Sequence, residues 1–393
     1  MITVVGCDGS PLPERAMDRL QKASLVVGGR RHLEAVRPPE RVRRIVLGDV
    51  PAALAEIDAV AGDDVVVLAS GDPGFFGILR SLREHGHAPE VLPAVSSVAG
   101  AFARIGLPWD DAVVVSAHGR DPRAAVNACR AMPKVAVLTS PACGPGEIGA
   151  ELAGWDRVLW VAERLGGPGE RVVRCTPAEA AARDWTDPNV VIALDEHRPA
   201  EGPRLHDQPT APPDGWAYAD DGYEHRAGMI TKWEVRAVVL SRLRPTLGTL
   251  IWDVGAGSGS VGVECAEHHA AVIAVERDPA ACDLIRRNAR STGVRVVEGA
   301  APEAYDGLPD PDAVFVGGGG LDALGGALAR RPGTAVATFA AVDRAVAARR
   351  LLADAGYAVE GVQLAASRFA DLPGGSFRLD AQNPVFVLTG RMR

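Results

Sequence analysis

One glycine-rich stretch constrains the C-terminal half of this 393-residue chain more than any other feature. The apolar run Thr249–Val254 leads directly into GAGSGS, and a helical pattern follows. Closely spaced glycines allow positive φ angles and a close approach of the backbone to a ligand. In a parallel α/β sheet, such a turn lies at the carboxyl end of a strand and beside a helix N-terminus. The stretch therefore predicts a nucleotide-cofactor domain.

Two acidic residues indicate which cofactor the loop would bind. Asp253 stands at the tip of the strand, where a carboxylate would repel a pyrophosphate but suit the cationic aminoacyl end of S-adenosylmethionine. Glu276 ends the next predicted strand, where it can hold both hydroxyls of a ribose. Gly257, Gly259 and Gly262 also match the G-x-G-x-x-G dinucleotide fingerprint. Binding of S-adenosylmethionine is the favoured interpretation. Binding of a dinucleotide, or a tight turn that binds no ligand, stays open as an alternative.

The strand and helix pattern predicts an α/β fold on both sides of a polar segment. After Thr231, an expected cap for a helix that ends near Leu243, strands and helices alternate as in a Rossmann-like doubly wound sheet. Two late strands, Val359–Ser367 and Asn383–Gly390, would close it as an antiparallel hairpin. The first half also alternates, which predicts an α/β domain with a mainly parallel sheet.

The polar segment between the two patterns is rich in proline, glycine and charge. A structureless stretch of this length is uncommon inside a compact domain, and the chain is too long for one core. We therefore predict a domain at residues 1–200, a linker at 201–228 and a second domain at 229–393.

Composition excludes several classes of protein. The net charge of −8 argues against nucleic-acid binding. No apolar run reaches the roughly 18–20 residues that span a bilayer, so no membrane is expected. The N-terminus lacks the features of a secretion signal, and the six cysteines include no CxxC pair. These features predict a cytoplasmic protein with unpaired thiols and no metal site.

Several ordered motifs resemble one family of enzymes. MITKWEVRA, WDVGAGSGSVGVE, AVERDPAACDLIRRNA, LPDPDAVFVGGGG and NPVFVLTG resemble the C-terminal domain of the precorrin-6Y C(5,15)-methyltransferase (decarboxylating) family of cobalamin biosynthesis, a class I S-adenosylmethionine methyltransferase domain. VVGGRRHL, LASGDPGFFGI, LPAVSSVAGAFARIGLPW, VVSAHGR and ERLGGPGERVV resemble its partner, a tetrapyrrole methylase domain. Both domains in this order on one chain imply the fused enzyme.

The resemblance implies a reaction and a set of partners. The N-terminal domain would methylate carbon 5 of a polycarboxylate tetrapyrrole. The C-terminal domain would methylate carbon 15 and remove carbon dioxide from the acetate chain at carbon 12. Each domain would use S-adenosylmethionine, and the relatives suggest a homo-oligomer. The alternatives left open are a Rossmann oxidoreductase and a scaffold with a degenerate N-terminal site.

The motifs and the resemblance together predict the cofactor sites. In the C-terminal domain the predicted cofactor-binding residues are Thr231, Asp253, Gly255, Ala256, Gly257, Ser258, Gly259, Glu276, Arg277, Ala300 and Ala301. In the N-terminal domain they are Gly71, Asp72, Pro73, Ser96 and Ser97. For the two serines, capping of a helix N-terminus is an equally good explanation.

An acidic protein that binds a polycarboxylate needs a local basic lining. The candidates are Arg30, Arg31, His32, His118, Arg120, Lys232, Arg236 and Arg368, and for each of them a solvated surface charge is the alternative. Gly318 belongs to the glycine run after the fourth strand, where methyl group and substrate would meet.

Three positions depart from the family pattern. Gly6–Pro13 reads GCDGSPLP where the class carries a GxGPG-like loop, and Ala94 replaces a usual glycine. Ala300 replaces a usual aspartate near the adenine. Because the departing loop Gly6–Pro13 belongs to the N-terminal domain, we expect the cofactor site of that domain to be the weaker of the two.

Overall fold

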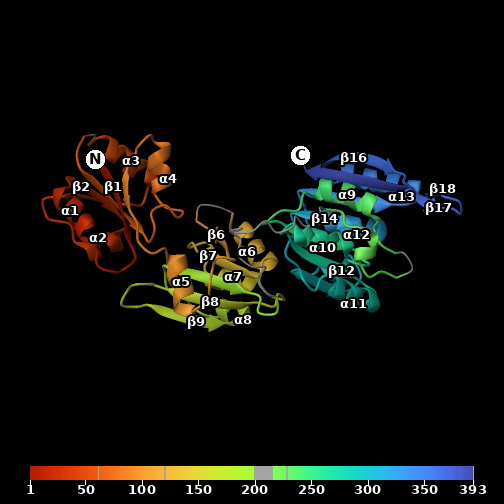
Figure 1. Ribbon diagram of the computed structural model, residues 1–393, viewed down its shortest axis with the longest axis horizontal. Coiled ribbons are helices and arrows are strands. Elements are labelled where there is room, and N and C mark those ends of the chain that lie inside the picture. The colour runs from red at the N-terminus through yellow and green to blue at the C-terminus, as the bar shows by residue number, and fades with distance from the viewer. Residues whose placement is uncertain (61, 119–120, 199–215, 227–228, 393) are drawn as a thin grey trace. The chain divides into compact units, whose positions relative to one another are not determined.

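The computed structural model describes residues 1–60, 62–118, 121–198, 216–226 and 229–392 (Figure 1). The chain forms two compact units. The first comprises residues 1–118, 136–147 and 159–192, and the second comprises residues 119–135, 148–158 and 193–393. Most of the linker predicted at residues 201–228 lies outside the described residues, so the domain bounds stay a prediction.

The N-terminal sheet has five strands in the order β3-β2-β4-β1-β5. All its pairings are parallel, and β1 matches β4 from Ile2 opposite Val65 to Cys7 opposite Ser70. The carboxyl ends of β1 and β4 therefore lie side by side. The elements are β1 (Ile2–Cys7), α1 (Glu14–Lys22), β2 (Leu25–Gly28), α2 (Arg30–Val36), β3 (Arg43–Val46), α3 (Val50–Asp58), β4 (Val65–Ser70), α4 (Leu79–Glu84) and β5 (Glu90–Leu92).

A second five-stranded sheet follows, in the order β6-β7-β10-β8-β9, with β9 antiparallel to β8. The sequence predicted one mainly parallel sheet for the first half, and the structure divides that half between two sheets. The elements are α5 (Ser97–Ile105), β6 (Val113–Ser116), α6 (Pro122–Ala131), β7 (Lys134–Leu138), α7 (Pro145–Glu151), β8 (Val158–Glu163), β9 (Arg171–Cys175), α8 (Pro177–Ala181) and β10 (Asn189–Leu194).

The C-terminal sheet has seven strands in the order β13-β12-β11-β14-β15-β19-β16. The first five pair in parallel, while β19 is antiparallel to both β15 and β16. This confirms the doubly wound sheet with two late antiparallel strands. The elements are η1 (Asp220–Gly222), α9 (Trp233–Leu243), β11 (Leu250–Val254), α10 (Ser260–Glu267), β12 (Ala271–Glu276), α11 (Pro279–Asn288), β13 (Val294–Glu298), η2 (Glu303–Tyr305), β14 (Ala313–Val316), α12 (Gly320–Ala329), β15 (Thr334–Phe339), α13 (Val342–Asp354), β16 (Tyr357–Leu364) and β19 (Val385–Met392).

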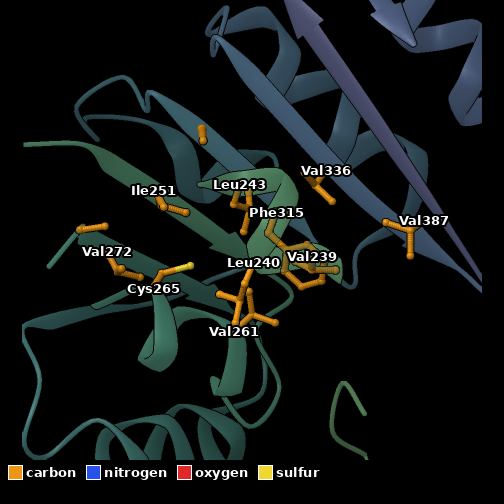
Figure 2. Close-up of a cluster of buried hydrophobic side chains, with 12 residues drawn as sticks. Val239, Leu240, Leu243, Ile251, Val261, Cys265, Val272, Phe315, Val336 and Val387 are labelled. Carbon is orange, nitrogen blue, oxygen red and sulfur yellow. The ribbon is translucent and has the colours of Figure 1, made fainter. Parts of the chain in front are cut away.

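Helix α9 covers one face of this sheet. Figure 2 shows its Val239, Leu240 and Leu243 among the side chains of Ile251 on β11 and Phe315 on β14. Central strands that are buried on both faces read as continuous apolar runs. The packing fixes β11 and β14 next to each other, so the loops at their carboxyl ends start from adjacent points.

Two features of the second unit differ from the expectation. Thr231 does not cap helix α9, so that prediction is wrong. The N-cap is Lys232, whose side chain makes no capping hydrogen bond, and Asp220 Oδ1 accepts the Trp233 N–H at 2.9 Å. A hairpin of β17 (Ser367–Asp371) and β18 (Phe377–Ala381) was not predicted.

Among the described residues, no helix is long and apolar enough to cross a bilayer. Within the same residues, no group of three or more histidine, cysteine or acidic side chains could hold a metal ion. Five of the six cysteines are buried and Cys7 is half-buried.

Candidate functional sites

The predicted glycine loop follows β11 and enters α10. Gly255, Gly257 and Gly259 have φ angles of 64°, 59° and 75°, a region that L side chains rarely adopt. A Cβ at Gly255 would overlap the backbone of Gly318, whereas a Cβ at Gly257 would meet no atom of the described residues within 4 Å. The loop thus contacts the glycine run after β14 at Gly255 and leaves open space at Gly257.

Asp253 lies beneath this loop and is fully buried. Its Oδ2 accepts the N–H of Gly262 at 2.8 Å, and its buried Oδ1 has no hydrogen-bond partner among the described residues. Burial, with a smaller contribution from the charge of Glu276, raises the pKa of Asp253 to about 7. The carboxyl is therefore partly ionised near neutral pH, and a nearby cation would favour its charged form.

The burial of Asp253 predicts a pH-dependent stability. The folded pKa of about 7 lies above the ordinary value of 3.8, so the stabilising contribution of the protonated form is complete below about pH 4 and is lost as pH rises through 7. The loss approaches about 4 kcal/mol. We expect Asp253→Asn to gain stability relative to the wild type between pH 4 and 8. Urea unfolding at several pH values measures the difference, and a constant difference would contradict the prediction.

Glu276 turns back onto the glycine loop from the end of β12. Its Oε2 accepts the N–H of Gly257 at 3.0 Å, and its Oε1 accepts the N–H groups of Arg277 and Asp278 at 2.8 and 3.0 Å. The carboxylate is therefore held beside the open space at Gly257. Oε2 keeps one lone pair, with which it can accept a hydrogen bond from a hydroxyl.

The other predicted residues of this site surround the same edge of the sheet. Ser258 is buried and its carbonyl accepts from Asn288 Nδ2 at 2.8 Å, which ties the loop to α11. Ala300 and Arg277 are exposed. Ala301 lines a shallow cleft of about 850 Å³ together with residues of α12 and α13.

The loops of the N-terminal site also meet at one edge of a sheet. A Cβ at Gly6 would overlap the carbonyl of Gly71 and the backbone of Ala94. A Cβ at Gly71 would press on the backbone of Ser96. The end of β1, the loop after β4 and the loop before α5 are therefore in backbone contact. This brings Gly71, Asp72, Pro73, Ser96 and Ser97 together.

Ser96 has the structural role that was left open. It is the N-cap of α5, and its Oγ accepts the N–H of Ala99 at 3.1 Å. Asp72 Oδ1 likewise accepts the N–H of Gly74 at 2.8 Å within its own turn. Both side chains are occupied by local backbone donors, and their contact with a cofactor stays a prediction.

The departing loop Gly6–Pro13 is held by a contact that the sequence did not reveal. Gly9, with a φ of 94°, and Gly166, with a φ of 73°, approach so closely that a Cβ on either would overlap the backbone of the other's loop. The loop is thus closed onto the Leu165–Gly167 turn.

This contact leads to a matched pair of substitutions. We expect Gly166→Ala to lower the free energy of unfolding by at least about 2–3 kcal/mol. Its Cβ would overlap backbone atoms, and alanine is strained at this positive φ. Gly106→Ala carries a similar φ of 67° but meets nothing within 4 Å, so about 1 kcal/mol is expected. Calorimetric unfolding of the two variants compares them, and equal losses would refute the overlap.

The basic candidates of the N-terminal domain are placed differently from one another. Arg31 and His32 both bond to Ser70 at the end of β4. Arg30 and His118 are exposed, and the N–H of His118 donates to Ser116 Oγ. Arg120 lies outside the described residues.

The basic candidates of the C-terminal domain are engaged with acidic residues. Arg236 is completely buried. It donates to Glu264, to the carbonyl of Thr231 and to the carbonyl of Tyr218. These partners use its guanidinium, so we correct its assignment from substrate binding to structure.

Lys232 and Arg368 keep partial exposure. Arg368 bonds Glu234 at 2.8 Å and Asp220 at 2.9 Å, and these two acids raise its pKa further. Lys232 Nζ lies 4.0 Å from Asp220. Their substrate contact stays a prediction.

Sequence reasoning missed Ser70, Glu264 and Asn288. Ser70 directly follows the apolar run VVVLA at residues 65–69 and precedes the Gly71–Pro73 turn, which was a usable signal. Glu264 and Asn288 stand on helices at positions that resemble ordinary helix residues, so only the fold identifies their partners.

Two family models of known proteins match this chain, one in its N-terminal half and one in its C-terminal half. Residues 4–181 match the family model for tetrapyrrole (corrin/porphyrin) methylases, and residues 221–382 match the model for a precorrin methyltransferase domain.

Among curated proteins, a precorrin-6Y C(5,15)-methyltransferase [decarboxylating] of Sinorhizobium is 40% identical over 82% of this chain and 79% of that protein. One of Mycobacterium tuberculosis with the same name is 33% identical over 81% of this chain and 80% of that protein. A cobalt-precorrin-7 C(5)-methyltransferase of Salmonella typhimurium is 34% identical over 50% of this chain and its own full length. The chain therefore belongs to the precorrin-6Y C(5,15)-methyltransferase (decarboxylating) family.

Proposed function

We propose that this methyltransferase uses S-adenosylmethionine to methylate carbons 5 and 15 of precorrin-6Y and removes carbon dioxide from the acetate chain at carbon 12. The N-terminal domain, residues 1–200, would serve carbon 5. The C-terminal domain, residues 229–393, would serve carbon 15 and the decarboxylation. The substrate is a small polycarboxylate tetrapyrrole.

The glycine loop after β11 is the observation that carries the proposal. Gly257 offers open space on its Cβ side, and the Glu276 carboxylate is held beside it. The buried Asp253, whose Oδ1 has no hydrogen-bond partner among the described residues, places a carboxyl beneath the loop that a cation would hold in its charged form. A ribose and a cationic sulfonium ligand fit this set of groups. A pyrophosphate would face the charge of Asp253.

S-adenosylmethionine supplies an electrophilic methyl group when it is bound. The protein then has to hold the nucleophilic ring carbon in line with that methyl group, and orientation alone contributes up to about 7–11 kcal/mol in well-arranged systems. For decarboxylation, the C-terminal domain has to hold the acetate chain out of the ring plane and away from water. This requirement explains why no paired carboxylates or nucleophile–base pair is needed in the C-terminal loop.

The separation of the two reactions is supported by the comparisons. The Salmonella typhimurium relative, named for carbon 5 alone, aligns over its full length with half of this chain. A cytoplasmic location and a homo-oligomeric assembly remain proposals that rest on the sequence and the resemblance.

Mass spectrometry of the product made from precorrin-6Y and S-adenosylmethionine tests the proposal. We expect the mass of two added methyl groups and one lost carbon dioxide, and calorimetry should give two S-adenosylmethionine sites per chain. Binding of NADH without S-adenosylmethionine binding would support an oxidoreductase instead. One cofactor site, with carbon 5 left unmethylated, would indicate a degenerate N-terminal domain.

A further inference from the structure

Three polar side chains meet where β4 ends and α2 begins. Ser70 is the last residue of β4, and its Oγ lies 2.8 Å from His32 Nε2. Arg31 Nη2 donates to the same Ser70 Oγ at 2.9 Å. Ser70 and Arg31 are exposed and His32 is half-buried. The group therefore has an open side toward the carboxyl edge of the N-terminal sheet.

The chemistry of the donors fixes the direction of these bonds. A guanidinium has no acceptor, so Ser70 Oγ must accept from Arg31. Arg31 Nε also donates to His32 Nε2 at 3.4 Å, so this nitrogen is an acceptor and the serine hydroxyl donates to it. Nε2 is therefore an unprotonated acceptor and Nδ1 carries the hydrogen of a neutral imidazole.

Burial and the charge of Arg31 maintain this state. They lower the pKa of His32 to about 4. Two further titratable groups stand at the end of β1. Cys7 interacts with Arg31 and Asp8, and Asp8 is held by Ser10 and the N–H of Val95. A carboxylate of the substrate that paired with Arg31 would offset its charge and make His32 more basic.

The position of the group connects it with the candidate cofactor loop. Ser70 is followed immediately by Gly71, Asp72 and Pro73, and it stands opposite Cys7 in the β1–β4 pairing. Ligands of parallel α/β sheets bind at this edge. A hydroxyl backed by a neutral imidazole at this point is an arrangement for accepting a proton.

We propose that Ser70 and His32 form a proton relay that takes up the proton released when the N-terminal domain methylates its substrate. This inference rests on the proposed function of that domain. It gives Ser70 contact with the substrate, while His32 acts through Ser70 as a positioning and proton-storing residue.

The step balances without any further reactant. The nucleophilic ring carbon forms a bond to the methyl group while the sulfur–methyl bond breaks, and the electron pair of that bond stays on the sulfur of a neutral thioether. The methylated macrocycle then carries one additional positive charge and releases a proton. Ser70 Oγ takes this proton as its own hydroxyl proton passes to His32 Nε2. The products are a neutral serine and an imidazolium, which loses its proton to solvent.

Single-turnover assays with the full chain test the relay, because the C-terminal domain provides an internal control. In Ser70→Ala and His32→Gln, we expect carbon 5 methylation to fall by about 100-fold or more. Methylation at carbon 15 and loss of carbon dioxide should be unchanged. Glu34→Gln, an exposed change on the same helix, should leave both reactions at the wild-type rate. The wild-type carbon 5 rate should decline at acidic pH, and His32→Gln should lose this acidic limb.

Two further measurements separate the possible failures. ¹⁵N NMR of histidine-labelled protein should show His32 at pH 7 with hydrogen on Nδ1 and none on Nε2, with the signal assigned through His32→Gln. Calorimetry should show unchanged S-adenosylmethionine binding in both variants. A hydrogen on Nε2, or variants with the wild-type rate and pH profile, would overturn the relay. Absence of carbon 5 methylation in the wild-type protein would overturn the proposed function of the domain instead.

Discussion

Replacing Arg236 with leucine is expected to lower the free energy of unfolding by about 3–5 kcal/mol, because it leaves a buried carboxylate without its cation. Glu264 is 1% exposed, and among the described residues it would keep three neutral donors, which are the N–H groups of Ala217 and Tyr218 and the hydroxyl of Tyr223. The melting temperature should fall by roughly 6–20 °C.

An exposed ion pair in the same unit is the control. Arg287 Nε bonds Glu224 at 2.9 Å, and both side chains are more than half exposed. Arg287→Leu should therefore cost less than about 1 kcal/mol. The double change of Arg236 and Glu264 to leucine should recover part of the loss. A single Arg236→Leu variant as stable as Arg287→Leu would show that the buried pair contributes little.

Gly255→Ala is expected to disrupt the C-terminal site together with its local fold, whereas Gly257→Ala should disrupt ligand binding alone. A Cβ at Gly255 would overlap the backbone of Gly318, in addition to the strain at a φ of 64°. We expect a stability loss of about 3 kcal/mol or more. A Cβ at Gly257 meets no protein atom within 4 Å, so it would fill only the space that the cofactor is proposed to occupy.

Thermal unfolding and S-adenosylmethionine calorimetry distinguish these two outcomes. Gly257→Ala should lose about 1 kcal/mol of stability and at least about tenfold in affinity at one of the two sites. Gly307→Ala controls for backbone strain, since Gly307 has a φ of 73° and an open Cβ position. Undiminished affinity in Gly257→Ala would place the cofactor elsewhere.

The fold of the second unit was largely predictable because its central strands are continuous apolar runs. A search for apolar runs does not find β3 and β9, whose sequences RRIV and RVVRC carry charged residues and are mostly exposed or half-buried. Such strands lie at the edges of their sheets, where one side needs no apolar partner. The hairpin β17–β18 was not predicted for a related reason, since every β18 side chain is exposed.

The candidate sites were predictable to the extent that glycines and strand ends define them. The loop at Gly255–Gly259 and the turn at Gly71–Pro73 follow directly from such local signals. Arg236 could not be assigned, because its charge is balanced by Glu264 from a neighbouring helix and by carbonyls of a segment that folds back. No local pattern distinguishes a buried arginine of this kind from one that faces a substrate.

The contact between Gly9 and Gly166 limits how this enzyme can change over evolution. Neither position accepts a side chain while the other loop keeps its course, so a substitution at one would require a simultaneous rearrangement at the other. Insertions or deletions in the first loop are restricted in the same way. Relatives that share the loop sequence of Gly6–Pro13 should therefore retain both glycines.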